Sequence, residues 1–163
     1  MDWLNQIGLG KDQTLILLEV MVAMVLGGII GYDREAAHKP AGLRTHMLVA
    51  SASALFVGLG SLIVQSFETR FPIDSVRTDP IRIFEAVITG ISFLGAGTII
   101  RHRGAEHVEG ITTAASLLMT AAIGATVGLS QRAVAVLLTG VVFVVLHIVS
   151  RIKVRTMRNQ KQQ

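Results

Sequence analysis

The chain has no cysteine and little charge, and each absence narrows what kind of protein it can be. Without cysteine it forms no disulfide and offers no thiolate to a metal. Charged residues make up 16% of the 163 residues, whereas a soluble domain usually carries about a quarter. The first twelve residues lack a basic start followed by an apolar core, so we expect no cleavable signal peptide. These absences favour an integral membrane protein over a soluble domain.

Long hydrophobic runs take the place of the missing charge. Hydrophobic residues make up 51% of the chain, and the mean hydropathy is +0.58. A helix needs about 20 apolar residues to cross about 30 Å of hydrocarbon. Five runs reach or approach this length, and they predict an all-α, multi-pass transmembrane bundle in a single domain, 1–163. The expected spans cover residues 14–32, 45–65, 81–100, 112–129 and 133–150, followed by a short basic tail, 151–163.

Basic residues between the runs predict the orientation, because cytoplasmic loops of membrane proteins are enriched in Lys and Arg. Ten of the fifteen basic residues fall on one side of the expected membrane. We therefore expect the N-terminus outside and the C-terminus in the cytoplasm. The net charge of +4 does not indicate a nucleic-acid partner, since no aromatic residues are interleaved with the basic ones. The ten are Arg34, Lys39, Arg44, Arg101, Arg103, Arg151, Lys153, Arg155, Arg158 and Lys161.

Small residues recur at every fourth position in three of the runs, the second of which has Ala50, Ala54 and Gly58 in this arrangement. Residues four apart share one face of a helix, and small side chains there let two helix backbones approach closely. The stripes therefore predict helix contacts inside the bundle, with association of two copies as the alternative. They contain Gly27 and Gly31 in the first run and Thr112, Ser116, Thr120 and Gly124 in the fourth.

Two acids, Glu19 and Glu85, fall inside expected spans, where an unpaired charge costs several kcal/mol. Their spans run in the same direction and place both acids at a similar depth. Thr89 and Ser92 follow Glu85 at helical spacing. One hypothesis is that the two acids face each other and hold a proton or a cation such as Mg²⁺. The alternative is structural, with Glu85 paired to Arg82 and Glu19 to an arginine in a loop.

The connection between the first two runs is polar and carries charges of both signs. Pro40 disfavours helix and Gly42 permits a turn, while Thr45 or a residue before it is expected to cap the second span. This segment is either a hairpin connection held by ion pairs or a cytosolic binding surface.

Recognised enzyme and metal motifs are missing from the sequence. All five histidines fall on the expected inner side, but no pair has a familiar metal-ligand spacing, so the sequence identifies no metal ligands. Nucleophile-elbow, zinc-protease and phosphate-loop patterns are absent as well. We expect no enzyme activity, and Mg²⁺ is the one candidate cofactor.

Three segments resemble the MgtC/SapB family of bacterial membrane proteins. They read GGIIGYDREAAHKPAGLRTHMLV over 27–49, GISFLGAGTIIR over 90–101 and GITTAASLLMTAAIGATVGL over 110–129. The resemblance implies five spans in the bacterial inner membrane and a link to magnesium limitation and, in some members, to survival in host phagocytes. It implies either a regulator of other membrane proteins, ATP synthase among them, or a magnesium transporter.

The resemblance also assigns residues to functional positions. Departures from the usual pattern are Glu19, Ala86, Glu109 and Leu118. Many virulence-associated members continue into a soluble C-terminal domain, whereas thirteen residues follow Ser150 here, so we do not expect that domain's role. The positions carried over are Asp33, Arg34, Glu35, Lys39, Pro40, Gly42, Arg44, Thr45 and His46 in the connection, and Gly95, Gly97, Thr112 and Thr113 in the third and fourth spans.

Two functions follow from these observations. The first is a regulator that contacts other membrane proteins, such as an ATPase or a transporter, through its packing faces and inner loops. The alternative is a transporter or channel for Mg²⁺ or protons that uses Glu19 and Glu85. The expected partners are the lipid bilayer, another membrane protein and a second copy of the chain.

Overall fold

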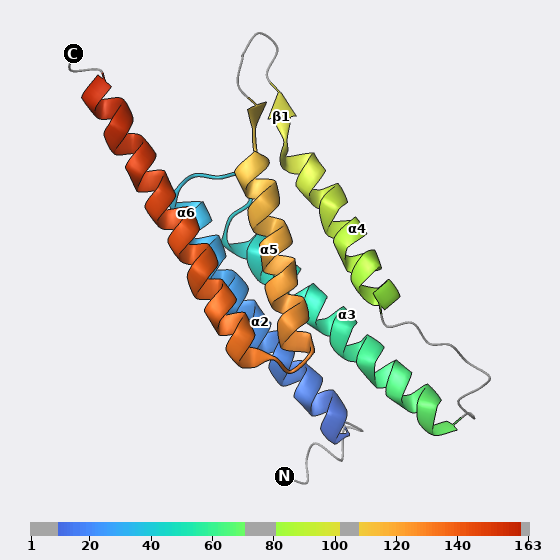
Figure 1. Ribbon diagram of the computed structural model, residues 1–163. Coiled ribbons are helices and arrows are strands. Elements are labelled where there is room, and N and C mark those ends of the chain that lie inside the picture. The colour runs from blue at the N-terminus through green and yellow to red at the C-terminus, as the bar shows by residue number, and fades with distance from the viewer. Residues whose placement is uncertain (1–9, 71–80, 102–107, 161–163) are drawn as a thin grey trace.

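A computed structural model describes residues 10–70, 81–101 and 108–160. Within these ranges the chain forms five helices and one short antiparallel ribbon (Figure 1). The elements are α2 (Lys11–Ala36), α3 (Leu43–Arg70), α4 (Ile81–Thr98), β1 (Ile100–Arg101), β2 (Val108–Glu109), α5 (Ile111–Gly128) and α6 (Arg132–Gln160).

The all-α bundle expected from the hydrophobic runs is confirmed. Helices α2, α3, α4 and α5 are each long and apolar enough to cross a membrane. The apolar part of α6, Arg132–His147, is shorter than such a span. The helix itself continues to Gln160, so most of the expected tail is helical, and residues 161–163 lie outside the described ranges. The orientation in the membrane stays a prediction.

The third span ends earlier than expected, and a ribbon follows it. Helix α4 stops at Thr98, and Ile100 and Arg101 pair antiparallel with Glu109 and Val108. Gly110 then starts α5 with φ of 95°, and a Cβ on this residue would collide with the carbonyl oxygen of Thr98. Only glycine adopts this left-handed conformation at little cost, so it permits the tight approach of the ribbon to α5.

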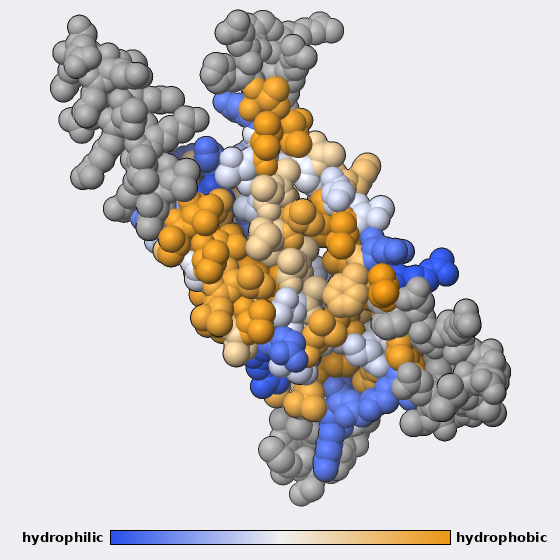
Figure 2. All heavy atoms as spheres, in the orientation of Figure 1, coloured by the Kyte–Doolittle hydropathy of each residue, from blue (hydrophilic) through white to orange (hydrophobic). Residues whose placement is uncertain are grey.

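The helices pack around α5, with α6 and α4 on opposite sides of it (Figure 1). Helix α2 contacts α3, α5 and α6, while α4 contacts α5 and, less extensively, α3. Figure 2 shows hydrophobic side chains covering the middle of α6 and hydrophilic ones gathered at the α5–α6 connection. This division matches helices that cross a hydrocarbon layer and place their connections in water.

The core lies where α2, α3 and α5 meet around Ala50. A Cβ on Gly27 would lie 2.7 Å from the Cβ of Ala50, and one on Gly124 would overlap the carbonyl oxygen of Ala50. Helix backbones can approach this closely only where one side chain is a hydrogen atom. Ala23, Leu26 and Ile30 of α2 are buried with Ala50, Ala54, Ile123 and Val127 in the same cluster.

Helix α4 is attached loosely by comparison. Among its 18 residues, Ile91 and Gly95 are buried, whereas Phe93 is 81% exposed. An apolar groove of about 940 Å³ separates α4 from α3, with Phe56, Ile63 and Leu94 among its lining residues. The bundle therefore consists of a tight core of α2, α3, α5 and α6 with α4 on its flank.

Candidate functional site

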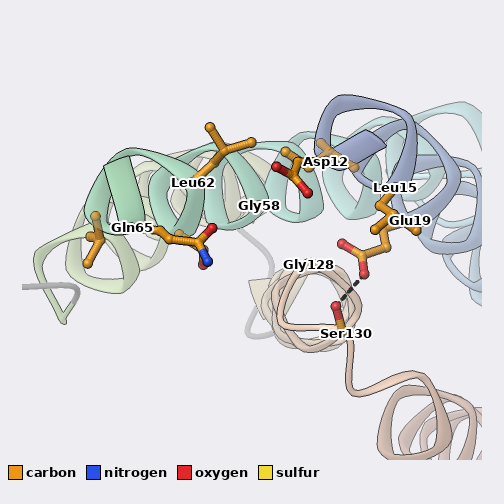
Figure 3. Close-up of a pocket in the computed structure, with 11 residues that line it drawn as sticks. Asp12, Leu15, Glu19, Gly58, Leu62, Gln65, Gly128 and Ser130 are labelled. Carbon is orange, nitrogen blue, oxygen red and sulfur yellow. Dashed lines mark hydrogen bonds between the residues drawn. The ribbon is translucent and has the colours of Figure 1, made fainter. Parts of the chain in front are cut away.

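The buried carboxylate of Glu19 lies at one end of the bundle, in an open cavity of about 480 Å³ that has both polar and apolar walls (Figure 3). The cavity lies between the beginning of α2, the later part of α3 and the end of α5. Its polar lining comes from Asp12, Glu19, Ser61, Gln65 and Ser130. Gly58 and Gly128 also line the cavity.

Ser130 holds the Glu19 carboxylate directly. Its Oγ donates a hydrogen bond of 2.6 Å to Glu19 Oε1, as Figure 3 shows. Ser130 has φ of 61°, in the left-handed region where glycine is the usual residue. The Ser130 and Gln131 N–H groups donate to the carbonyl oxygens of Val127 and Thr126, closing the end of α5 as a Schellman motif. A serine in this strained conformation indicates that its hydroxyl is retained for the hydrogen bond to Glu19.

The positively charged side chain of Arg132 lies near the Glu19 carboxylate. Arg132 Nη2 is 3.8 Å from Glu19 Oε1, and the arginine side chain is half exposed. Glu19 and Asp12 contribute carboxylate oxygens, and Ser61 and Ser130 contribute hydroxyls, so these residues could hold a hydrated cation at the mouth of the cavity. No cluster of three His, Asp or Glu side chains suited to a metal occurs in the described ranges.

The expectation that Glu85 faces Glu19 is wrong. Glu85 is exposed on α4, and it is not among the residues lining the cavity of Glu19. The physical reason is the placement of α4, which packs on α5 and α3 and turns Glu85, Thr89 and Ser92 away from them. Thr89 Oγ1 donates to the backbone oxygen of Glu85 within the same helix. A separate ion-binding role for these residues stays a prediction.

A second polar cluster lies at the opposite end of the core, where α2 meets α6. Arg34 is 2% exposed, and its guanidinium donates to Asp33 Oδ2 at 2.5 Å and to the Leu146 carbonyl oxygen at 3.3 Å. His147 Nδ1 donates to the other Asp33 oxygen at 2.8 Å, and its ring stacks on Phe143. The buried arginine is tolerated here because a carboxylate and a backbone carbonyl both accept hydrogen bonds from its guanidinium. This cluster ties α6 to α2.

His46 makes a third polar contact, fully buried between α3 and α5. Its Nδ1 lies 2.9 Å from the Gly42 carbonyl oxygen, which can only accept, so Nδ1 is assigned the proton. Its Nε2 lies 3.1 Å from Ser116 Oγ, and the one proton of that hydroxyl is shared between Nε2 and the Thr113 carbonyl oxygen, which lies 2.8 Å from the same oxygen atom. The small-residue face of α5 thus provides a hydrogen-bond partner as well as close packing.

The connection between α2 and α3 is shorter than expected because both helices extend into it. Helix α2 continues to Ala36 and therefore contains Asp33, Arg34 and Glu35. Glu35 Oε2 accepts the Leu43 N–H at 2.7 Å, so this carboxylate, and not Thr45, binds the first turn of α3. Lys39, Pro40, Arg44 and Thr45 are exposed, and Gly42 is half-buried.

The residues expected at helix contacts divide into two groups. Gly27, Gly31, Gly95, Thr113, Ser116, Thr120 and Gly124 are buried between helices. Gly97 and Thr112 are exposed, and a Cβ on Gly97 would meet no atom within 4 Å, which corrects their expected role in internal packing. Gly97 lies on the loosely attached α4, and Thr112 lies in the first turn of α5 beyond the packed core.

Sequence reasoning missed Ser130 and His147 as partners of Glu19 and Asp33. Each lies more than 110 positions from the acid it contacts, so no local spacing connects them. The one available signal was the cluster Ser130-Gln131-Arg132, which interrupts two apolar runs and places a hydroxyl and a cation at a helix end.

Comparison with known proteins gives a consistent family match. The model of the MgtC family matches residues 20–155. YhiD of Escherichia coli K12, named as a candidate magnesium transporter, is 38% identical over 112 residues, which are 69% of this chain and 50% of YhiD. Protein MgtC of Brucella abortus strain 2308 is 40% identical over 116 residues, 69% of this chain and 43% of that protein.

Protein SrpB of Synechococcus elongatus is 37% identical over 115 residues, which are 67% of this chain and 60% of SrpB. The chain therefore spans about half the length of the relatives it matches. No solved structure matches the chain significantly.

Proposed function

This chain belongs to the MgtC family, and from that premise we propose that it regulates another membrane protein by direct contact, in a role linked to magnesium homeostasis at the bacterial inner membrane. The names of YhiD and MgtC among its relatives support the link to magnesium. Regulation by contact rests on the arrangement of the core and of α4.

The apolar core between the two polar ends of α2 carries this proposal. Glu19 lies about two turns inside the start of α2 and Arg34 lies near its end, about 22 Å apart along the helix at 1.5 Å per residue. Between them Ala23, Leu26 and Ile30 are 0–7% exposed, and they form one cluster with Ile123 and Val127 of α5. A path for hydrated Mg²⁺ needs polar groups or water along its length. Packing of this kind favours a rigid binding scaffold over a conduit.

The groove between α3 and α4 is the surface we assign to the regulated protein. It runs from Leu48 to Val64 on α3 and from Arg82 to Leu94 on α4, and most of its lining is apolar. An apolar transmembrane helix of the partner fits this chemistry, since helices in lipid associate through packing and shape. The exposed α2–α3 connection adds a polar surface that we expect to face the cytoplasm.

A pair of matched alanines tests this assignment. Ala52 lies in the groove on α3, and Ala122 is exposed on α5 outside it. Ala52→Phe fills the groove and should abolish rescue of growth at low magnesium in a strain lacking the protein, while Ala122→Phe should rescue as well as wild type. Equal rescue by both variants, at equal amounts of membrane protein, would exclude the groove.

Transport is the second candidate, and one observation favours it. Glu19 is a buried carboxylate at the end of an open cavity, which is the arrangement expected of a cation entry site. Its hydrogen bond to Ser130 and the nearby Arg132 provide a structural reason for the same burial. Ion flux through the purified protein separates the two functions.

A further inference from the structure

We propose that the outward face of α4 pairs with the same face of a second copy of this chain, forming a two-fold symmetric dimer. This face is defined by Thr89, Ser92 and Ala96, with Arg82 and Glu85 at its end, and all five are exposed. The proposal does not depend on the proposed regulatory function, because Glu85, Thr89, Ser92 and Ala96 do not line the groove, although Arg82 lies at the edge shared by the two surfaces.

The exposure of polar groups on this face is costly in lipid. Helix α4 is a candidate membrane span, yet Glu85 and Ser92 lie on its exposed side. Glu85 and Arg82 form no ion pair in the described part of the chain, although they are three residues apart on one helix. An ionised group at the lipid surface of a span is destabilising unless a partner covers it. Coverage of this face by a second helix would remove that cost.

The helical positions of these residues create a narrow seam. At about 100° per residue, Thr89 and Ala96 lie within about 20° of each other on the side opposite the buried Ile91. Ser92 and Ala96 are four residues apart and both small, so a second helix can approach the backbone closely along this line. Val87, Gly90 and Leu94 line the groove on a different side of the helix.

The two charges identify the partner as a second copy. Arg82 and Glu85 lie about 60° apart, one on each flank of the line through Thr89 and Ala96. When two parallel α4 helices meet across a two-fold axis, each flank faces the opposite flank of its neighbour. Arg82 of each copy then faces Glu85 of the other, and both pairs form at once. A different protein would need its own matched pair of charges at the same depth.

Cysteine crosslinking tests the face directly, because the chain has no cysteine of its own. A single cysteine gives one thiol per chain, so a disulfide-linked product of twice the mass of the chain joins two copies. In native membranes, mild oxidation should convert Ala96→Cys to a crosslinked dimer at least about fivefold more than Val141→Cys, an exposed control on α6. Equal crosslinking at the two positions, or none at Ala96→Cys, would overturn the proposal.

Exchange of the two charges tests the reciprocal pairs. In Arg82→Glu copies all four facing groups are acidic, and in Glu85→Arg copies all four are basic, so each variant alone should dimerise about fivefold less than wild type. When the two variants are produced together, every facing pair is again opposite in charge. Differently tagged copies should then co-purify at wild-type levels.

Recovery in the mixture cannot come from a pair within one chain, since each single variant carries like charges at both positions. Lack of recovery, with both variants present in the membrane at normal amounts, would contradict the assignment of Arg82 and Glu85. The cysteine experiment leaves these charges unchanged, so it still decides the proposal if either charge variant fails to fold.

Discussion

Ser130 and Glu19, 111 positions apart in the sequence, are joined by a hydrogen bond of 2.6 Å that fastens the α5–α6 connection to α2. The bond satisfies a carboxylate that is 4% exposed. It also explains why a serine occupies a left-handed position that glycine would fill with less strain.

The strain and the hydrogen bond at Ser130 can be measured separately. Ser130→Ala keeps the backbone strain and removes the donor to a buried carboxylate, while Ser130→Gly removes both. We expect both variants to unfold at lower temperature than wild type, with the alanine variant less stable than the glycine variant by about 1 kcal/mol. Thermal unfolding in detergent provides the comparison. An alanine variant as stable as wild type would mean that the bond to Glu19 contributes nothing.

Glycines at helix crossings should respond to alanine differently from those facing outward. Gly124→Ala forces a methyl group against the carbonyl oxygen of Ala50 and should cost about 1–3 kcal/mol. Gly97→Ala meets open space and should be neutral or slightly stabilising, because alanine favours helix by up to about 1 kcal/mol. The same unfolding assay distinguishes them, and equal stability of the two variants would disprove the close contact at Ala50.

The buried pair His46 and Ser116 should act as one unit. Ser116→Ala removes the hydroxyl that faces His46 Nε2 and should destabilise the protein by about 1–3 kcal/mol. Thr126→Ala is the control, since the Thr126 hydroxyl only bonds the carbonyl of Ala122 in its own helix. In a double-mutant cycle with His46→Ala, a coupling of about 0.5 kcal/mol or more is expected. Additive effects would mean that the two side chains are independent.

Hydropathy and small-residue spacing were sufficient to predict the helices and the close contacts of Gly27, Gly31 and Gly124. Both signals are local, since a run of apolar residues and a four-residue repeat are properties of one helix. The ends of α2 and α3 were harder, because hydropathy falls at Asp33 although the helix continues to Ala36. The sequence did not predict the ribbon of β1 and β2, because two residues per strand are too few to show the alternation of apolar and polar residues that is typical of a strand.

The partners of the buried polar residues were beyond sequence reasoning. Matched depth suggested Glu85 as the partner of Glu19, but depth does not determine which helices are neighbours. Helix α4 packs on α5 and α3, so Glu85 points outward and Ser130 contacts Glu19 instead. His46 was assigned to a loop motif, whereas it is buried in α3 against Ser116.

The orientation of the bundle rests on the unequal distribution of basic residues. Gln131 and Lys39 are exposed in the connections at opposite ends of the helices. In intact cells a membrane-impermeant thiol reagent should label Gln131→Cys, and it should label Lys39→Cys only after the membrane is opened. Labelling in the reverse order would invert the topology, and Ala122→Cys, within a span, provides the unlabelled control.

Magnesium flux in liposomes containing only the purified protein tests the regulatory account most directly. Because Ala23, Leu26, Ile30, Ile123 and Val127 fill the core beyond Glu19, we predict Mg²⁺ entry no faster than in protein-free liposomes. Glu19→Gln should leave this low rate unchanged. Saturable Mg²⁺ uptake by the wild-type protein that is lost in Glu19→Gln would contradict the account and establish transport through the Glu19 cavity.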